Sequence, residues 1–314
     1  MKSTATVNPL LSGAAVKYMR NPGGFVGARL FPAFKSGVAS SEYYVFDTEN
    51  FLGVPRNIRH APGAAYKRVM PKLSSDTYNC RDYGLEQPVP DQDRAKYAGS
   101  FNADLSAIRR LTDFIKINHE IRVKEKATDP NVVPHADIAV QWDQAVSNPK
   151  ADVDFGKEEI RKACGMRPNT MIISRTVMNA LETHPKIADL FKYTTPGLMD
   201  AEKLKNYFGI ENIFVAEQTV ATNQEGQPIT VSDIWADDVV LAIVQPGDDL
   251  MLLNFGRTIY WSAFGKVTGE DEVPIQIESY RDNPVASDVH RAQHATDEKL
   301  TAPAAGFLLR NALT

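Results

Sequence analysis

The spacing of apolar residues predicts one long helix in the first half of the chain. Apolar residues recur at steps of three and four between Phe101 and Ile121, and the surrounding stretch contains no proline. That period places these side chains on one face of an amphipathic helix. The pattern predicts a helix over 93–128, which would be roughly 50 Å long at 1.5 Å per residue. Gly99 is the position where this helix would kink or break.

The chain before this helix is typical of extended structure. Residues 1–40 are rich in small residues, glycine and proline, which predicts an extended arm with one short helix at 9–20. Residues 41–47 have strand composition, and 78–86 are the expected partner strand. The irregular stretch between these strands predicts a long projecting hairpin. Irregular stretches of this length are unusual inside a compact domain and are generally functional or mobile.

The chain after the helix alternates between helical and extended patterns, which predicts an α/β subdomain and then a return to strands. The expected helices are 138–146, 154–165, 175–184 and 199–209, and the expected strands are 169–174, 212–220, 238–246, 258–264, 274–280, 288–296 and 306–313.

Composition excludes several classes of protein. With 314 residues, 43% hydrophobic and 24% charged, the chain is globular and long enough to bury a proper core. A net charge of -4 gives no reason to expect a dedicated nucleic-acid binder. Two cysteines, Cys80 and Cys164, are too few for a disulfide framework and favour a reducing compartment. The sequence has no apolar stretch of ~18 residues, so no membrane span is expected.

The sequence carries no recognised catalytic signature: the phosphate-binding, dinucleotide-binding, nucleophile-elbow and zinc-protease motifs are absent. His290 and His294 are four apart on an expected strand, about 13 Å from each other, and are interpreted as surface or interface histidines. Cys164 is interpreted as a small buried residue. Paired acids, such as those in 269–272, suit turns. The chain is therefore expected not to be an enzyme and to have no catalytic, cofactor or metal site.

Charge is distributed unevenly along the chain. Residues 51–81 contain six basic residues and one acid, a balance of +5, whereas 223–256 contain six acids and no base. Three interpretations of this charge distribution remain open. The two stretches are unrelated solvated surfaces, or the basic loop docks on an acidic region of a neighbouring copy, or the basic loop contacts phosphates. The candidate basic contacts are Arg56, Arg59, Lys67, Arg68 and Lys72. Their candidate acidic counterparts are Asp233, Asp237, Asp238, Asp248 and Asp249.

Four segments in order carry a resemblance to a known family. They are FGIENIFVAE, SDIWADDVVLAIVQPG, NFGRTIYWSAFG and DEKLTAPAAGFLLRNAL, at 208–217, 232–247, 254–265 and 297–313. Together with the order of arm, hairpin, long helix and α/β region, they resemble the major capsid proteins of tailed double-stranded DNA phages, which have the Hong Kong 97-type fold.

This resemblance implies an α+β fold with named parts. The N-terminal arm would be 1–40 and the E-loop, a long β-hairpin, 41–92. The P-domain would be 93–165, with a spine helix at 93–128. The α/β A-domain would be 166–255, and 256–314 would return to complete the P-domain.

The resemblance also implies a role. The chain would self-assemble into hexamers and pentamers of an icosahedral shell around phage double-stranded DNA, with sparse, non-specific DNA contacts. Partners would include a separate scaffolding protein, a portal and a decoration protein, but no membrane. Assembly would occur in the host cytoplasm, and the protein would reside in the virion. The alternatives are an encapsulin-type nanocompartment shell and, less favoured, a two-domain α/β enzyme.

Overall fold

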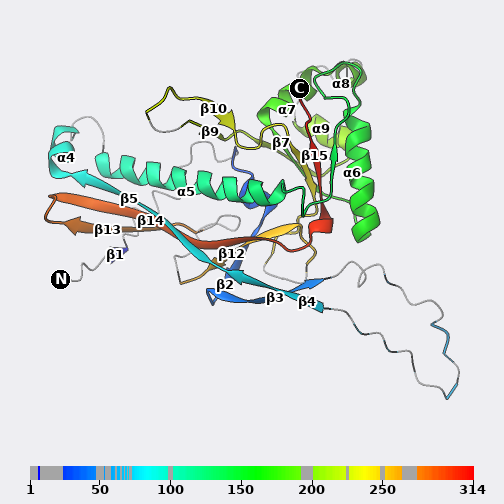
Figure 1. Ribbon diagram of the computed structural model, residues 1–314, viewed down its shortest axis with the longest axis horizontal. Coiled ribbons are helices and arrows are strands. Elements are labelled where there is room, and N and C mark those ends of the chain that lie inside the picture. The colour runs from blue at the N-terminus through cyan, green and yellow to red at the C-terminus, as the bar shows by residue number, and fades with distance from the viewer. Residues whose placement is uncertain are drawn as a thin grey trace.

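The computed structural model shows two β-sheets side by side, one under a long helix and the other flanked by shorter helices (Figure 1). The projecting β3–β4 hairpin lies below the first sheet. The residues that the structure describes are 6–7, 24–46, 53, 58–60, 62–63, 66, 68, 70, 73–97, 102–191, 201–223, 226–247, 252–263 and 274–314.

The long helix is α5, Ala103–Ala127, which spans 25 residues. It begins at Asn102, whose side chain accepts a hydrogen bond from the backbone N–H of Leu105 at 3.0 Å. A shorter helix, α4 (Asp91–Tyr97), precedes it. Two helices therefore cover the stretch 93–128 in place of one continuous helix, and the expected kink or break at Gly99 falls between them, outside the described residues.

The sheet beneath α5 is organised around one long strand, β14 (Ser287–Leu300). Three strands pair with β14 in antiparallel fashion, and Thr296 pairs with Arg81 on one edge and Tyr260 on the other. The remaining strands of this sheet are β5 (Arg81–Pro90), β12 (Gly256–Trp261), β13 (Gln276–Asp282), β2 (Ala33–Ser36) and β1 (Thr6–Val7). Because β14 has neighbours on both edges, it forms the axis of this half of the molecule.

The projecting hairpin pairs β3 (Ser40–Phe46) with β4 (Leu73–Asn79) in antiparallel register. The expected partner strand 78–86 is only partly correct, because β4 ends at Asn79 and β5 begins at Arg81. After Cys80 the chain changes partner and pairs with β14 over ten residues. The expected strand is therefore divided: its first residues pair with β3, and the residues from Arg81 onward pair with β14.

The second sheet has the order β6–β15–β11–β7–β8. Every residue of β7 and β11 is buried, as expected for strands covered on both faces. These strands are β6 (His135–Asp137), β7 (Thr170–Ser174), β8 (Asn212–Ala216), β11 (Val239–Ala242) and β15 (Gly306–Arg310). The helices beside them are α6 (Pro149–Cys164), α7 (Arg175–Thr183), α8 (Pro185–Phe191) and α9 (Ala201–Phe208).

Local signals explain where several of these elements begin and end. Gly165 has φ of 74°, a left-handed conformation that terminates α6. The Ser174 hydroxyl accepts from the backbone N–H of Val177 and caps α7. The smaller elements are α2 (Gly27–Leu30), the ribbon of β9 (Thr219–Ala221) and β10 (Val231–Asp233), and the 3-10 turn η2 (Pro303–Ala305).

The helix expected at 138–146 is wrong. The segment follows the short strand β6 and runs in turns along the end of β15. The backbone N–H of Trp142 donates to the carbonyl of Ala312 at 2.7 Å, and its indole N–H donates to Asp152 at 2.9 Å. Trp142 is fully buried. Tertiary burial of this tryptophan therefore overrides the helical pattern. The strand expected at 212–220 is divided into β8 and β9, and the helix expected at 9–20 lies outside the described residues.

The main apolar core surrounds the second sheet, and a small cluster lies between α5 and the first sheet. That cluster consists of Ile108, Leu111, Ile115, Ile277 and Ala292. Within the described ranges, no helix combines the length and hydropathy needed to cross a membrane.

Candidate functional site

The root of the projecting hairpin is held firmly against the first sheet. The hydroxyl groups of Tyr78 and Ser36 lie 2.7 Å apart, and the backbone N–H of Asn79 donates to the Asp297 carboxylate at 2.9 Å. The hydroxyl of Tyr43 donates to Asp76 at 2.9 Å. Burial, followed by this hydrogen bond, raises the pKa of Tyr43 far above its ordinary value. The hairpin is therefore built to project from a rigid base.

The described residues beyond β3 and β4 expose large apolar side chains. Ile58 is 80% exposed, and Tyr66 and Met70 are each 79% exposed. The rings of His60 and Tyr66 stack with their centres 4.0 Å apart. Three large exposed apolar side chains on one projecting segment make this segment a candidate protein-contact surface. Sequence reasoning singled out the basic residues of this segment and missed its apolar ones, although Ile58 and Met70 were visible in the sequence.

The structure locates only part of the predicted basic set. Arg59 and Arg68 are exposed on the projecting segment. Arg56, Lys67 and Lys72 lie outside the described residues.

The predicted acidic set is similarly divided. Asp233 accepts a hydrogen bond from the hydroxyl of Thr176, and Asp237 and Asp238 are half-buried. Burial raises the pKa of Asp238, and the nearby cations Lys124 and Arg310 oppose that shift. Two further members of the set, Asp248 and Asp249, lie outside the described residues, as do the acids of 269–272.

The described members of the two charged sets lie on different sides of the chain. Figure 1 shows the projecting hairpin at the lower side of the molecule and β10, which carries Asp233, at the upper side. Among the described members of the two sets, no ion pair joins Arg59 or Arg68 to an acid. A pairing of Arg59 or Arg68 with Asp233, Asp237 or Asp238 would therefore require a second copy of the chain.

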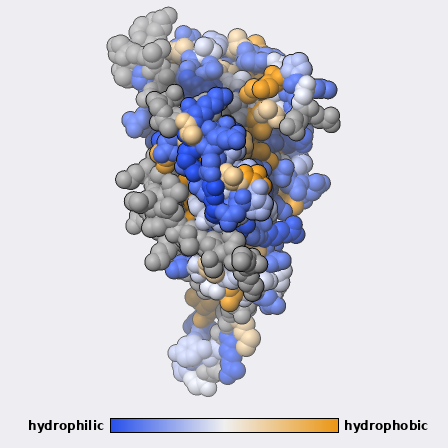
Figure 2. All heavy atoms as spheres, turned by 90° about the vertical axis from the view of Figure 1, so that its left-hand side faces the viewer, coloured by the Kyte–Doolittle hydropathy of each residue, from blue (hydrophilic) through white to orange (hydrophobic). Residues whose placement is uncertain are grey.

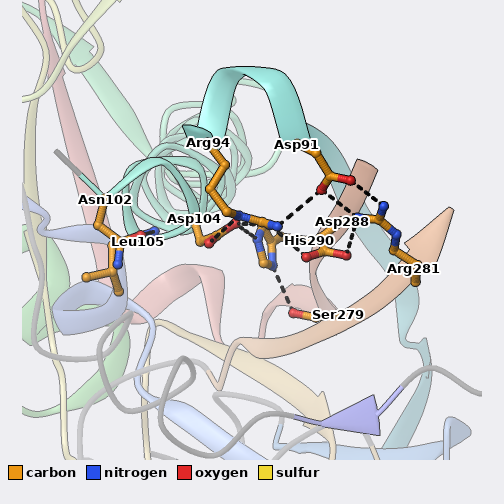
Figure 3. Close-up of polar contacts among 9 residues, drawn as sticks. All are labelled: Asp91, Arg94, Asn102, Asp104, Leu105, Ser279, Arg281, Asp288 and His290. Carbon is orange, nitrogen blue, oxygen red and sulfur yellow. Dashed lines mark hydrogen bonds and ion pairs between the residues drawn. The ribbon is translucent and has the colours of Figure 1, made fainter. Parts of the chain in front are cut away.

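A polar cluster ties α4 and α5 to the β13–β14 hairpin (Figure 3). Arg94 lies 2.8 Å from an oxygen of Asp104 and 2.7 Å from an oxygen of Asp288. Arg281 donates to Asp91 at 2.7 Å. Burial acts to raise the pKa of Asp104, but the hydrogen bonds from Arg94 and His290 lower it below its ordinary value.

This cluster borders an open cavity of about 570 Å³. Its lining residues are Arg94, Asn102, Asp104, Ser279, Tyr280, Arg281, Asp288 and His290. Both arginines of the cavity already face aspartates, so the charges are balanced internally. The cavity is accordingly a structural junction between helix and sheet.

The interpretation of His290 and His294 as surface residues is wrong. His290 is 4% exposed and His294 is 1% exposed. The Nε2 atom of His290 lies 2.9 Å from Asp104, and its Nδ1 atom lies 2.8 Å from the Ser279 hydroxyl. Both histidines are covered because β14 is paired on both edges and α5 packs on its face. The polar composition of 287–298 concealed this burial.

The carboxylate of Glu120 joins three distant segments. It accepts hydrogen bonds from the backbone N–H groups of Val26 and Gly27 at 3.1 and 2.7 Å, and from the indole N–H of Trp235 at 2.6 Å. Glu120 is 1% exposed, and burial raises its pKa although all three donors oppose the shift. The arm is thus fastened at Val26 and Gly27 to α5 and to the β10–β11 connection.

The two cysteines are both buried. Cys164 is buried, as expected, and burial raises the pKa of its thiol. Cys80 is also buried, and burial raises its pKa to about 11. Within the part of the chain that the structure describes, no group of three or more histidine, cysteine or acidic residues is placed to hold a metal ion.

Comparisons with known proteins point to one class. A family model described as phage major capsid protein E matches residues 127–250. The major capsid protein of Burkholderia phage BcepMu is 28% identical over 246 residues, which cover 76% of each chain.

Two solved structures add to this result. The crystal structure of a phage-related protein from Bordetella bronchiseptica RB50 is 26% identical, covers 98% of both chains and has a TM-score of 0.76. A mature capsid chain of bacteriophage PhiM1 is 14% identical with a TM-score of 0.56, covering 93% of this chain and 87% of its own. The predictions of a phage major capsid protein and of an α+β capsid-type fold are confirmed.

Proposed function

We propose that this chain is the subunit that builds the closed shell of a tailed phage, self-assembling into hexamers and pentamers around double-stranded DNA. The observation that carries this proposal is the exposure of Ile58, Tyr66 and Met70 on the projecting segment. Burying them against a neighbouring copy would contribute roughly 1.5–3 kcal/mol per side chain. Repeated over a closed shell, such contacts add up.

The Hong Kong 97-type division of the chain is part of this proposal. The arm would be 1–40, the E-loop 41–92, the P-domain 93–165 with α5 as its spine helix, and the A-domain 166–255. Residues 256–314 would complete the P-domain. The pairing of β14 with β5 and the packing of α5 on this sheet support that assignment.

The E-loop would contact the adjacent subunit through apolar and basic side chains together. Arg59 and Arg68 are exposed on the same segment as the three apolar residues, and β10, which carries Asp233, lies on the opposite side of their own chain. An acidic surface near Asp233 and Asp237 on a neighbour would complement them. Asp238 is a weaker candidate, since Lys124 and Arg310 of its own chain already act on it.

Further partners follow from the same proposal. They are a scaffolding protein, a portal, a decoration protein and the packaged DNA, which would be contacted sparsely and without sequence preference. Assembly would take place in the host cytoplasm and the product would be the virion capsid. An encapsulin-type shell is less favoured, because the matching family model and curated relative are phage capsid proteins.

The test is assembly of the purified chain, followed by size exclusion and negative-stain microscopy, with and without a co-expressed scaffold. Rings, tubes, sheets or shells are expected from the wild type. The triple variant Ile58→Asp, Tyr66→Asp and Met70→Asp is expected to remain folded but to lose at least 100-fold in assembly propensity, about 2.7 kcal/mol. The matched control Ile58→Leu, Tyr66→Phe and Met70→Leu keeps the apolar surface and should assemble. A stable wild-type monomer at high concentration would overturn the proposal.

A further inference from the structure

A buried cluster of ionisable side chains lies where the middle of α5 packs on β14 and β12. Its members are His119 and Arg122 from α5 and His294 and Glu298 from β14. His119 is 6% exposed, His294 1% and Glu298 4%. Around them, β12 contributes the hydroxyl of Thr258, 3.2 Å from His119 Nε2. The other neighbours are the hydroxyl of Thr296 on β14 and the ring of Tyr83 on β5.

Arg122 is the centre of the cluster. Its guanidinium group donates to both carboxylate oxygens of Glu298, at 3.1 and 3.0 Å. The same group lies 3.8 Å from the ring centre of Tyr83. Its Nη2 atom is also 3.2 Å from Nε2 of His294. Arginine nitrogens only donate hydrogen bonds, so Nε2 of His294 must be the acceptor.

This geometry fixes the protonation state of His294. An imidazole that accepts at Nε2 is neutral and carries its proton on Nδ1. In the described structure that Nδ1 atom is buried without a hydrogen-bond partner. Protonation would turn the acceptor toward Arg122 into a second donor and would place two cations side by side.

His119 is subject to opposing influences. Its Nε2 atom lies 3.6 Å from a Glu298 oxygen, and its ring centre lies 6.2 Å from that of His294. Burial lowers the pKa of His119 to about 4; Glu298 opposes this shift and Arg122 reinforces it. Burial, then His119 and Arg122, lower the pKa of His294 well below its ordinary value. Both imidazoles are therefore held neutral by their surroundings.

We propose that these four side chains form an acid-sensitive lock that holds α5 on β14 and β12 and opens when the imidazoles take up protons. The charged groups facing the two histidines are Arg122 and Glu298, while β12 and β5 present the uncharged Thr258 and Tyr83. The lock lies inside one subunit, so it is independent of the proposed assembly contacts.

The direction of the pH effect follows from proton binding. Between about pH 4 and 6.5 the unfolded chain binds more protons at His119 than the folded chain, so folding stability rises with pH. The contribution is complete above pH 6.5 and is lost as the pH falls. For a folded pKa of about 4, His119 alone raises the unfolding equilibrium constant about 20-fold between pH 7 and pH 5. His294 acts in the same direction.

The test is urea unfolding of the full chain at pH 7 and pH 5, comparing the wild type with His119→Gln/His294→Gln. Glutamine can still accept from Arg122 but does not titrate. The pH-dependent rise in the unfolding constant is expected to be at least about 20-fold larger in the wild type. The control His135→Gln removes an exposed histidine from β6 and should behave as the wild type. Equal pH dependence of the wild type and the double variant would overturn the proposal.

A second measurement keeps the proposal testable if the double variant fails to fold. Imidazole resonances of the wild type are followed by NMR between pH 7 and pH 4. His119 and His294 are expected to remain neutral at pH 6, below the ordinary histidine pKa of about 6.5. Amide protection of α5 should fall as they titrate. Ordinary titration of both rings, or titration without loss of protection, would exclude the lock.

Discussion

The two sheets of this subunit are stabilised by different kinds of contact. The strands β7 and β11 bury Met171, Ile172 and Leu241 among other apolar side chains, in a core made of apolar residues. The strand β14 is nearly as well covered, yet many of its buried residues, such as His294 and Glu298, are polar. Apolar burial is insensitive to pH, whereas buried ion pairs depend on the protonation of each partner. The first sheet is therefore the half that can respond to its surroundings.

The end of the molecule formed by α4 and the β13–β14 hairpin has a largely hydrophilic surface. Figure 2 views the end of the molecule to which α4 and the β13–β14 hairpin point, and blue, hydrophilic side chains dominate it. Apolar side chains gather in smaller groups, mainly in the upper half of this face. The elements that carry Asp91, Arg94 and Arg281, which are α4 and the β13–β14 hairpin, lie at this end. At this end the first sheet, called the polar sheet below, reaches the surface, where solvent and salt screen its ion pairs.

The largest expected effect comes from breaking the buried pair of the polar sheet. Arg122→Met leaves the Glu298 carboxylate buried and uncompensated, which should cost about 3–5 kcal/mol in the free energy of unfolding at pH 7. Urea unfolding measures this loss. Adding Glu298→Gln to the same chain should recover at least half of it. A loss below about 1 kcal/mol for the single variant would show that this pair is not critical.

A second variant tests the second sheet, whose core is apolar. Leu241 is fully buried, and its methyl group approaches α6 so closely that a Cβ atom on Gly156 would lie 2.8 Å from it. Leu241→Ala should cost about 2–5 kcal/mol through lost burial and the cavity left behind. The loss should be equal at pH 7 and pH 5, because no charge is involved. Leu241→Met, which conserves volume, should cost less than about 1.5 kcal/mol.

The smallest expected effect separates burial from charge within the polar sheet. Arg291 donates to Glu86 at 2.6 Å, but their side chains are 36% and 41% exposed. Arg291→Ala should therefore change the free energy of unfolding by only about 0–1 kcal/mol. Thermal melts at low and high salt check this, with Arg122→Met as the comparison. Equal losses in the free energy of unfolding for the two arginine variants would contradict the view that burial determines how much an ion pair contributes to stability.

Local sequence signals were sufficient for much of the second sheet. The apolar runs at 169–174 and 238–246 correspond to β7 and β11, and Gly165 ends α6 as expected. These elements were predictable because nearest-neighbour propensity and final burial agree there. The helix expected at 138–146 failed because Trp142 is needed in the core, a requirement that comes from residues far away in sequence.

The site was predicted less completely than the fold. The basic residues of the projecting segment stood out by charge, but its exposed Ile58 and Met70 did not, because nothing in a sequence marks an apolar residue as uncovered. His290 and His294 were expected at a surface or interface, because strand spacing separates them by about 13 Å and no third metal ligand lies nearby in the sequence. Their burial depends on the pairing of β14 with β5, which lies about 200 residues earlier in the chain.

By itself, the sequence determined the class of this protein, the long amphipathic helix, most strands and the uneven distribution of charge. These features depend on local periodicity and composition, which are readable without knowledge of distant contacts. The tertiary structure decided which polar residues are buried, and how Arg122 pairs with Glu298 beside two neutral histidines. Those interactions join residues more than 170 positions apart, so only the folded chain brings them within hydrogen-bonding distance.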